Sequence, residues 1–119
     1  MAETPRTIIV GNWKMNGLRS DGKVLVQTFA ELVSISVPER CDIVVCPPAT
    51  LLVTLAGALE DAGVALGAQD CHTGTSGAHT GDLSAAMLAD AGCNYIIVGH
   101  SERRTNYGET DGLVRTKSE

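Results

Sequence analysis

The chain has 119 residues, a formal net charge of -5 and an apolar composition with few aromatic side chains, which suits packed layers of strands and helices. The longest run of like charges is the pair Arg103 and Arg104. Nucleic acid and anionic membranes bind to clusters of basic residues, so the sequence excludes both as partners. The longest apolar stretch, residues 47–59, is too short to cross a bilayer, and residues 1–7 lack a signal peptide's apolar centre, so we expect a cytoplasmic protein.

The first part of the chain predicts two strand and helix units. Residues 7–11 form a β-branched run without polar alternation, which indicates a buried strand. A helix starting near residues 20–22 is predicted because mostly apolar side chains then recur at helical spacing: Val24, Leu25, Thr28, Phe29, Leu32 and Val33. Residues 42–46 predict a second strand, and residues 51–59 predict a second helix that ends before Gly63.

The second part repeats this alternation. Residues 64–68 predict a third strand, and a loop rich in glycine follows. Residues 83–91 predict a helix with Asp82 at its N-cap, and residues 94–99 predict a fourth strand. Residues 110–119 begin a helix that the sequence cuts off.

Alternating strands and helices with short connections predict parallel βαβ units and an α/β fold. An open doubly wound sheet could be complete at this length, whereas a (β/α)8 barrel needs about 250 residues. Periodicity alone leaves both architectures open.

The cysteines predict free thiols. None of the four, Cys41, Cys46, Cys71 and Cys93, belongs to a Cys-x-x-Cys pair, and the odd spacing of the first two places them on opposite faces of a strand. Cys71 lies near His79, but no further ligand has the spacing of a zinc site, so no metal is expected.

Polar side chains follow the first and fourth predicted strands. In parallel α/β folds the chemistry lies at the carboxyl ends of strands. Asn12 and Lys14 follow the first strand and, at period-two spacing, share a face; an ammonium and an amide aimed at one spot suit a phosphate or a developing oxyanion. A solvated turn lysine is the alternative.

The fourth strand ends at His100. The sequence Gly99-His100-Ser101-Glu102-Arg103 is not a serine hydrolase elbow, because Arg103 stands where that motif needs glycine. A helical turn that begins near Ser101 directs its positive end at the imidazole, which favours the neutral ring.

Three segments together resemble the motifs of the triosephosphate isomerase family in order and spacing. They are Gly11-Asn12-Trp13-Lys14-Met15-Asn16, Gly77-Ala78-His79-Thr80-Gly81-Asp82 and Tyr95-Ile96-Ile97-Val98-Gly99-His100-Ser101-Glu102-Arg103-Arg104. The resemblance implies the barrel rather than the open sheet, with residues 1–119 as one incomplete domain: the first four βα units of a TIM (β/α)8 barrel, ending within the fourth helix.

The resemblance also implies an activity and roles for site residues. The family interconverts dihydroxyacetone phosphate and glyceraldehyde 3-phosphate through an enediolate, without a cofactor. Lys14 corresponds to the cation that faces the phosphate and the developing charge, Asn12 to an added polar contact, and His100 to the neutral electrophile. Ser101 and Glu102 correspond to supporting groups around the site.

A dimer is implied as well. In the family, the loop after the third strand inserts into the other subunit, so Thr80 is expected to support Asn12 across that interface and Arg103 to meet Asp82 of the other subunit. The family often has phenylalanine where His79 stands and glutamate where Asp82 stands.

The family's proton-abstracting glutamate follows the sixth strand, and no carboxylate of this chain matches it. We therefore expect the 119-residue chain alone to be inactive. Four barrel strands expose two edges and an apolar face, so we expect self-association, pairing with a complementary C-terminal half, or partial disorder of the isolated chain. The alternative function is a non-catalytic half-barrel module for assembly or binding.

Overall fold

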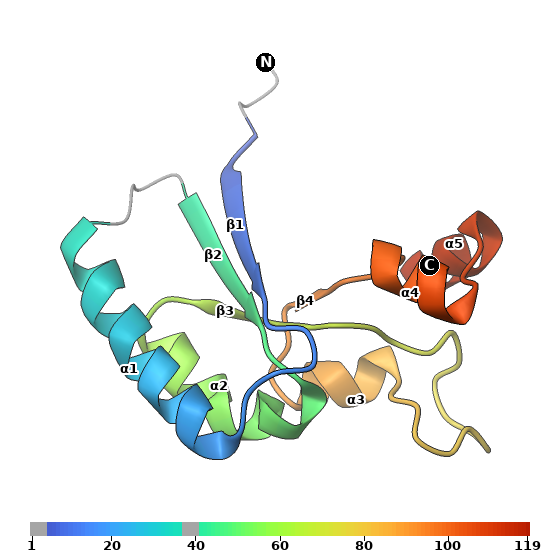
Figure 1. Cartoon of the computed structure of the whole chain (residues 1–119), viewed down its shortest axis with the longest axis horizontal. Helices are drawn as coiled ribbons and strands as arrows, with labels where there is room; N and C mark the ends of the chain where they lie inside the picture. Colours follow the sequence, from blue (N-terminus) through green and yellow to red (C-terminus); the bar gives the residue numbers. More distant parts are fainter. Residues whose placement is uncertain (1–4, 37–40) are drawn as a thin grey trace.

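The computed structural model describes residues 5–36 and 41–119, which form one four-stranded sheet with accompanying helices (Figure 1). No helix within these ranges is long and apolar enough to span a membrane. The elements in chain order are β1 (Thr7–Asn12), α1 (Arg19–Ser36), β2 (Cys41–Cys46), the 3-10 helix η1 (Ala49–Leu51), α2 (Leu52–Asp61), β3 (Ala65–Ala68), α3 (Ala85–Asp90), β4 (Tyr95–Ile96), α4 (Ser101–Tyr107) and α5 (Asp111–Ser118).

The strands pair in their chain order, β1-β2-β3-β4, and every pair is parallel. Asn12 lies opposite Cys46 and Ala68 lies opposite Ile96, so the carboxyl ends of all four strands lie at one edge of the sheet. A doubly wound sheet reverses its strand order at one point, whereas successive barrel strands keep it. The predicted half barrel of four parallel strands is therefore confirmed.

The core lies between the sheet and the helices that follow its strands. Leu55 and Leu59 of α2 are 1% and 0% exposed, and they pack with buried residues of β2 and β3. Gly22 lets α1 approach α2, because a Cβ at this position would lie 3.3 Å from both methyl groups of Leu55. The predicted second helix is confirmed, and its apolar stripe is the one that is buried.

The four cysteines are free thiols, as the sequence predicts. Cys46 is buried at the end of β2, whereas Cys41 at the start of the strand is partly exposed. Burial raises the pKa of the Cys46 thiol to about 11, with a smaller contribution from Cys93. Cys46 is therefore an uncharged packing group at neutral pH.

The buried face of α1 differs from the predicted one. Val24 and Leu32 are exposed, whereas Val26 is 6% exposed and belongs to the core. Gly22, Val26, Phe29 and Val33 follow one another at spacings of three or four residues, and these form the face toward the core. The predicted stripe shares only Phe29 and Val33 with this face and omits Val26, so it was displaced around the helix.

The prediction that the first strand is buried is wrong for the described structure. Ile8, Ile9 and Val10 are 47%, 56% and 48% exposed. The reason is that β1 lies at an edge of the sheet and has a strand neighbour, β2, on one side only. The β-branched run thus predicted the strand correctly but not the exposure of its side chains.

The fourth unit is shorter than predicted. β4 comprises Tyr95 and Ile96, although backbone hydrogen bonds from Asn94 to Leu66 and from Ile97 to Ala68, both 2.8 Å, extend its pairing with β3. The preceding helix, α3, is capped by Ser84 and not by Asp82, which corrects the prediction: the Ser84 hydroxyl accepts a hydrogen bond from the Met87 amide at 3.2 Å. Asp82 lies too far before Ala85 to cap the helix. It is part of a turn in which its amide donates a hydrogen bond to the His79 carbonyl oxygen.

Truncation of Leu55 tests this core. Leu55→Ala is expected to lower the free energy of unfolding by about 2 to 5 kcal/mol, because it leaves a cavity between α1, α2 and the sheet. Val53→Ala, at a 76% exposed position on the same helix, is the matched control and should change it by less than about 0.5 kcal/mol. Urea denaturation followed by circular dichroism measures both, and equal losses would contradict the packing of α2.

Candidate active site

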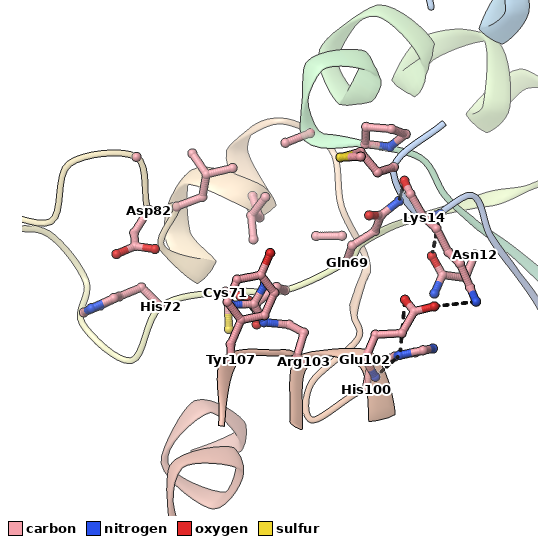
Figure 2. A pocket seen from close by; sticks show the side chains of 18 of the residues that line it. Asn12, Lys14, Gln69, Cys71, His72, Asp82, His100, Glu102, Arg103 and Tyr107 are labelled. Carbon is pink, nitrogen blue, oxygen red and sulfur yellow. Dashed lines mark hydrogen bonds and ion pairs between the residues drawn. The ribbon is translucent and has the colours of Figure 1, made fainter. Parts of the chain in front are cut away.

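A cavity of about 550 Å³ lies at the carboxyl ends of β1, β3 and β4 (Figure 2). Each of these strands is followed by polar residues that line it. They are Asn12 at the end of β1 and Lys14 after it, Gln69 and Asp70 after β3, and His100 and Glu102 after β4. This edge is where parallel α/β folds place their chemistry.

Lys14 lies in an unusual backbone conformation at this edge. Its φ of 57° makes it the only non-glycine residue with a positive φ in the described ranges. The Lys14 amide donates a hydrogen bond to the Asn12 side-chain oxygen at 3.0 Å, and the Gln69 side-chain amide donates to the Lys14 carbonyl oxygen at 2.9 Å. These two contacts hold the lysine at the cavity.

His100 is the N-cap residue of α4. Its Nδ1 accepts a hydrogen bond from the backbone amide of Glu102 at 3.1 Å. An imidazole nitrogen that accepts a hydrogen bond carries no proton, so the ring proton is assigned to Nε2. The predicted helical turn after His100 is confirmed, and one amide of its first turn, that of Glu102, donates to the imidazole.

Glu102 contacts both residues (Figure 2): its carboxylate pairs with Lys14, and its backbone amide donates to His100. The Lys14 ammonium lies 2.6 Å from one Glu102 carboxylate oxygen, and the other oxygen lies 3.7 Å from Nδ1 of His100. The hydrogen bond from Lys14 lowers the pKa of Glu102 below its ordinary value. Both partners are about half exposed, so water screens the pair and an anion entering the cavity can compete for the ammonium.

The structure gathers most of the residues that the sequence singled out. Asn12, Lys14, His100 and Glu102 line one cavity, and Asp82 and Arg103 also line it. Ser101 and Thr80 are exposed and are not among the lining residues. Their expected contacts, and those of Asp82 and Arg103 with a second subunit, stay predictions.

A cluster of charged side chains behind the cavity was not predicted. The Lys117 ammonium lies 2.7 Å from Asp70 and 2.9 Å from Glu109, and the Arg103 guanidinium lies 3.1 Å from Asp70 and 2.5 Å from Glu109. Arg103 also lies over the Tyr107 ring, 4.5 Å from its centre. The sequence feature that could have predicted this cluster is the polar pair Gln69 and Asp70, which follows β3 at the edge where functional residues were expected.

The side chains of Glu109 and Lys117 are almost fully buried, at 3% and 7% exposure. Burial alone raises the pKa of Glu109, but the hydrogen bonds from Lys117 and Arg103 outweigh it, and the pKa lies below its ordinary value. The second carboxylate oxygen of Glu109 is buried without a hydrogen-bond partner. The cluster fastens α4 and α5 to the end of β3.

The loop between β3 and α3 carries two stacked histidines. The rings of His72 and His79 lie 4.0 Å apart at an angle of 28°, and Nδ1 of His72 accepts a hydrogen bond from the Gly74 amide at 2.8 Å. Within the described ranges, no three His, Cys, Asp or Glu side chains gather into a group that could hold a metal ion.

Comparison with known proteins identifies what the chain is similar to. Residues 7–119 match the sequence model of the triosephosphate isomerase family. The chain is 54% identical over 114 residues to triosephosphate isomerase of Gluconacetobacter diazotrophicus, covering 96% of this chain and 46% of that relative. It is 53% identical over 119 residues to the enzyme of Afipia carboxidovorans, covering 96% of this chain and 45% of that one.

The fold also resembles that of a solved structure. The crystal structure of triosephosphate isomerase from Bartonella henselae superimposes with a TM-score of 0.85 at 43% sequence identity. The match covers 94% of this chain and 45% of that chain. The chain thus spans about half the length of the curated relatives that it matches.

Acid should weaken the structure through Glu109. Because its folded pKa is depressed, its contribution to stability is fully present above the ordinary value of 4.5 and is lost as the pH falls through the folded pKa. Glu109→Gln is expected to remove this acid dependence and to destabilise the chain at pH 7 by about 3 kcal/mol, because the buried Lys117 ammonium and the partly exposed Arg103 guanidinium each lose one of their two carboxylate partners.

Urea denaturation between pH 3 and pH 7 measures the effect. Glu60→Gln, at an exposed position of α2, is the control and should leave both the stability and its pH profile nearly unchanged. A Glu109→Gln variant with the wild-type acid dependence would contradict the assignment.

Proposed function

The chain belongs to the triosephosphate isomerase family, and on that basis we propose that it supplies one side of a site that interconverts dihydroxyacetone phosphate and glyceraldehyde 3-phosphate. The observation that carries the proposal is the single cavity shared by Lys14 and His100. The reaction moves a proton between neighbouring carbons through an enediolate, and needs no cofactor. We place the activity in glycolysis and gluconeogenesis, in the cytoplasm, with a dimer as the active form.

Lys14 is proposed to bind the anionic substrate. In the structure its ammonium is neutralised by Glu102 in a half-exposed pair, which a phosphate or an enediolate oxygen can replace. The fixed backbone of Lys14 limits the positions that the ammonium can reach. Asn12, whose side-chain oxygen already accepts a hydrogen bond from the Lys14 amide, adds a polar contact through its side-chain nitrogen.

His100 is proposed to polarise the substrate carbonyl. Since Nδ1 is occupied by the Glu102 amide, Nε2 carries the proton and is the donor that remains for a substrate oxygen. A preorganised donor stabilises the negative charge that develops on that oxygen in the transition state. Ser101 and Glu102 then act through His100 and Lys14 and not on the substrate.

The proton-abstracting base is proposed to come from outside these 119 residues. Glu102 is held by Lys14 and its pKa is lowered, so it is a poor base for a carbon acid. Asp70, a second carboxylate of the cavity, is paired with Lys117 and Arg103. We therefore expect the 119-residue chain by itself to be inactive.

Contacts with a second subunit complete the proposal. Thr80 and Asp82 lie exposed on the loop that follows β3, where another chain can reach them. Arg103 already has partners within its own chain, Asp70 and Glu109. Its contact with Asp82 of another subunit would add to these pairs.

A chimera tests the reaction. It joins residues 1–119 to the part of the Gluconacetobacter diazotrophicus enzyme that lies beyond the matched segment, and turnover of glyceraldehyde 3-phosphate is followed in a coupled assay. The chimera is expected to be active. His100→Gln should lower kcat by about 100- to 10,000-fold, because the imidazole donor that the Glu102 amide holds in place is replaced by a flexible amide.

His79→Phe in the same chimera is the control, because this loop histidine does not line the cavity of Lys14 and His100. It should leave kcat within about twofold. A folded chimera that keeps full activity after His100→Gln would refute the role of His100. Rapid turnover by residues 1–119 alone, abolished by His100→Gln, would show that the base lies within this chain.

A further inference from the structure

A short turn connects β4 to α4 and ends at His100. The pairing of β4 with β3 ends where the Ile97 amide donates to the Ala68 carbonyl oxygen at 2.8 Å, and α4 begins at Ser101. Within this turn Gly99 has a left-handed φ of 65°. The carbonyl group of Gly99 and the amide of His100 form one planar peptide unit. The orientation of that unit therefore sets the direction in which the His100 side chain leaves the backbone.

The Arg104 side chain holds this peptide unit. Its Nε donates a hydrogen bond to the Gly99 carbonyl oxygen at 2.9 Å, and its Nη1 donates to Oδ1 of Asp111 at 2.6 Å. Arg104 lies on α4 and Asp111 is the first residue of α5, so one guanidinium joins the turn to both helices (Figure 1). A guanidinium is planar and donates in fixed directions, so it fixes the orientation of the carbonyl as well as its distance.

The turn also packs against α5. A Cβ at Gly99 would lie 2.7 Å from both methyl groups of Val114 and 3.1 Å from Nη2 of Arg104. No side chain fits there, and the bare backbone approaches both groups closely. The peptide between Gly99 and His100 thus has little room to rotate away from the guanidinium.

We propose that Arg104, oriented by Asp111, is a positioning residue for His100: it fixes the Gly99 carbonyl and thereby aims the imidazole into the cavity of Lys14. The inference rests on the proposed function, because it assigns a further residue to the same reaction. Among the described residues, Arg104 is not one that lines this cavity, so it acts through His100 and not on the substrate.

The ring of His100 depends on this support. The Glu102 amide donates to Nδ1 at 3.1 Å, but this contact persists only while the His100 backbone keeps its place relative to α4. A reacting group must be held within about 0.5 Å of its productive position, and a displacement of about 1 Å can lower a rate about 100-fold. The hydrogen bond from Arg104 constrains the backbone side of His100, and the one from Glu102 constrains the ring side.

Exposure distinguishes this role from a role in folding. The side chains of Arg104 and Asp111 are 38% and 95% exposed, so water screens their attraction and the pair adds little to stability. The neighbouring arginine, Arg103, instead contacts the buried Glu109. Loss of Arg104 is therefore expected to displace His100 while the helices remain folded.

Nitrogen-15 NMR of the histidine rings in the 119-residue chain is the first test, at about pH 8, where an ordinary imidazole is neutral. The wild-type His100 ring should give two well-separated nitrogen signals, because Nδ1 accepts the Glu102 amide and Nε2 carries the proton. Arg104→Met is expected to bring the two signals closer together, toward the average of both tautomers.

Asp111→Ala, at an exposed position, should move the two ring signals in the same direction as Arg104→Met, because the guanidinium loses the carboxylate that orients it. Circular dichroism checks that the variants keep their helices. Unchanged ring signals in either folded variant would overturn the proposal.

Arg115→Met is the matched control. Arg115 also pairs with a surface carboxylate, that of Glu119 at 3.2 Å, and is 83% exposed, but it does not hold the Gly99 carbonyl. The substitution removes the same positive charge and should leave the His100 signals unchanged. An equal shift in Arg104→Met and Arg115→Met would show an effect of net charge and would overturn the proposal.

Kinetics of the chimera are the second test. Arg104→Met is expected to lower kcat about 10- to 100-fold and to leave KM within about twofold, because Lys14 keeps its place. Arg115→Met should leave both constants within about twofold. A folded Arg104→Met chimera with full kcat would overturn the positioning role. An inactive wild-type chimera would instead refute the proposed function, and the ring signals would then decide the role of Arg104 by themselves.

Discussion

The side-chain amide of Gln69 holds together the ends of three strands, and the geometry of the site depends on it. Its nitrogen donates to the carbonyl oxygens of Lys14 and Cys46, both at 2.9 Å, so one group ties the end of β3 to the ends of β1 and β2. Lys14 needs this support because its backbone conformation is rare for a residue with a side chain. Parallel pairing then brings His100, at the end of β4, to the same edge.

Two groups of charges flank this edge and differ in how easily they separate. The pair of Lys14 and Glu102 is half exposed, so its attraction is screened and it can open for an anion. Glu109 and Lys117 are almost fully buried, and their separation would leave uncompensated charges in the interior. The buried group therefore serves as the fixed anchor of α4 and α5, while the exposed pair remains exchangeable.

Local sequence patterns predicted whether most segments are helices or strands, because side-chain periodicity differs between the two. They also predicted that Lys14 and His100 lie at the same edge of the sheet, because parallel strands end at one edge. Properties set by neighbours were not predictable in this way. The exposure of β1 depends on what lies beside its free edge, and the cap of α3 at Ser84 depends on where the preceding turn ends. Gln69 acts through Lys14 and Cys46, which lie 55 and 23 residues away in the sequence, so no local pattern reveals its role. The burial of Glu109 depends on how α4 and α5 pack against the end of β3.

At position 14 the requirements of stability and of the cavity oppose each other, because the left-handed backbone favours glycine whereas the cavity has a lysine ammonium. Glycine adopts a φ of 57° without strain, whereas a lysine held there costs about 1 kcal/mol or more. The same residue carries the ammonium of the cavity. A laboratory selection for thermostability alone would therefore favour glycine at this position and discard the charge of the ammonium.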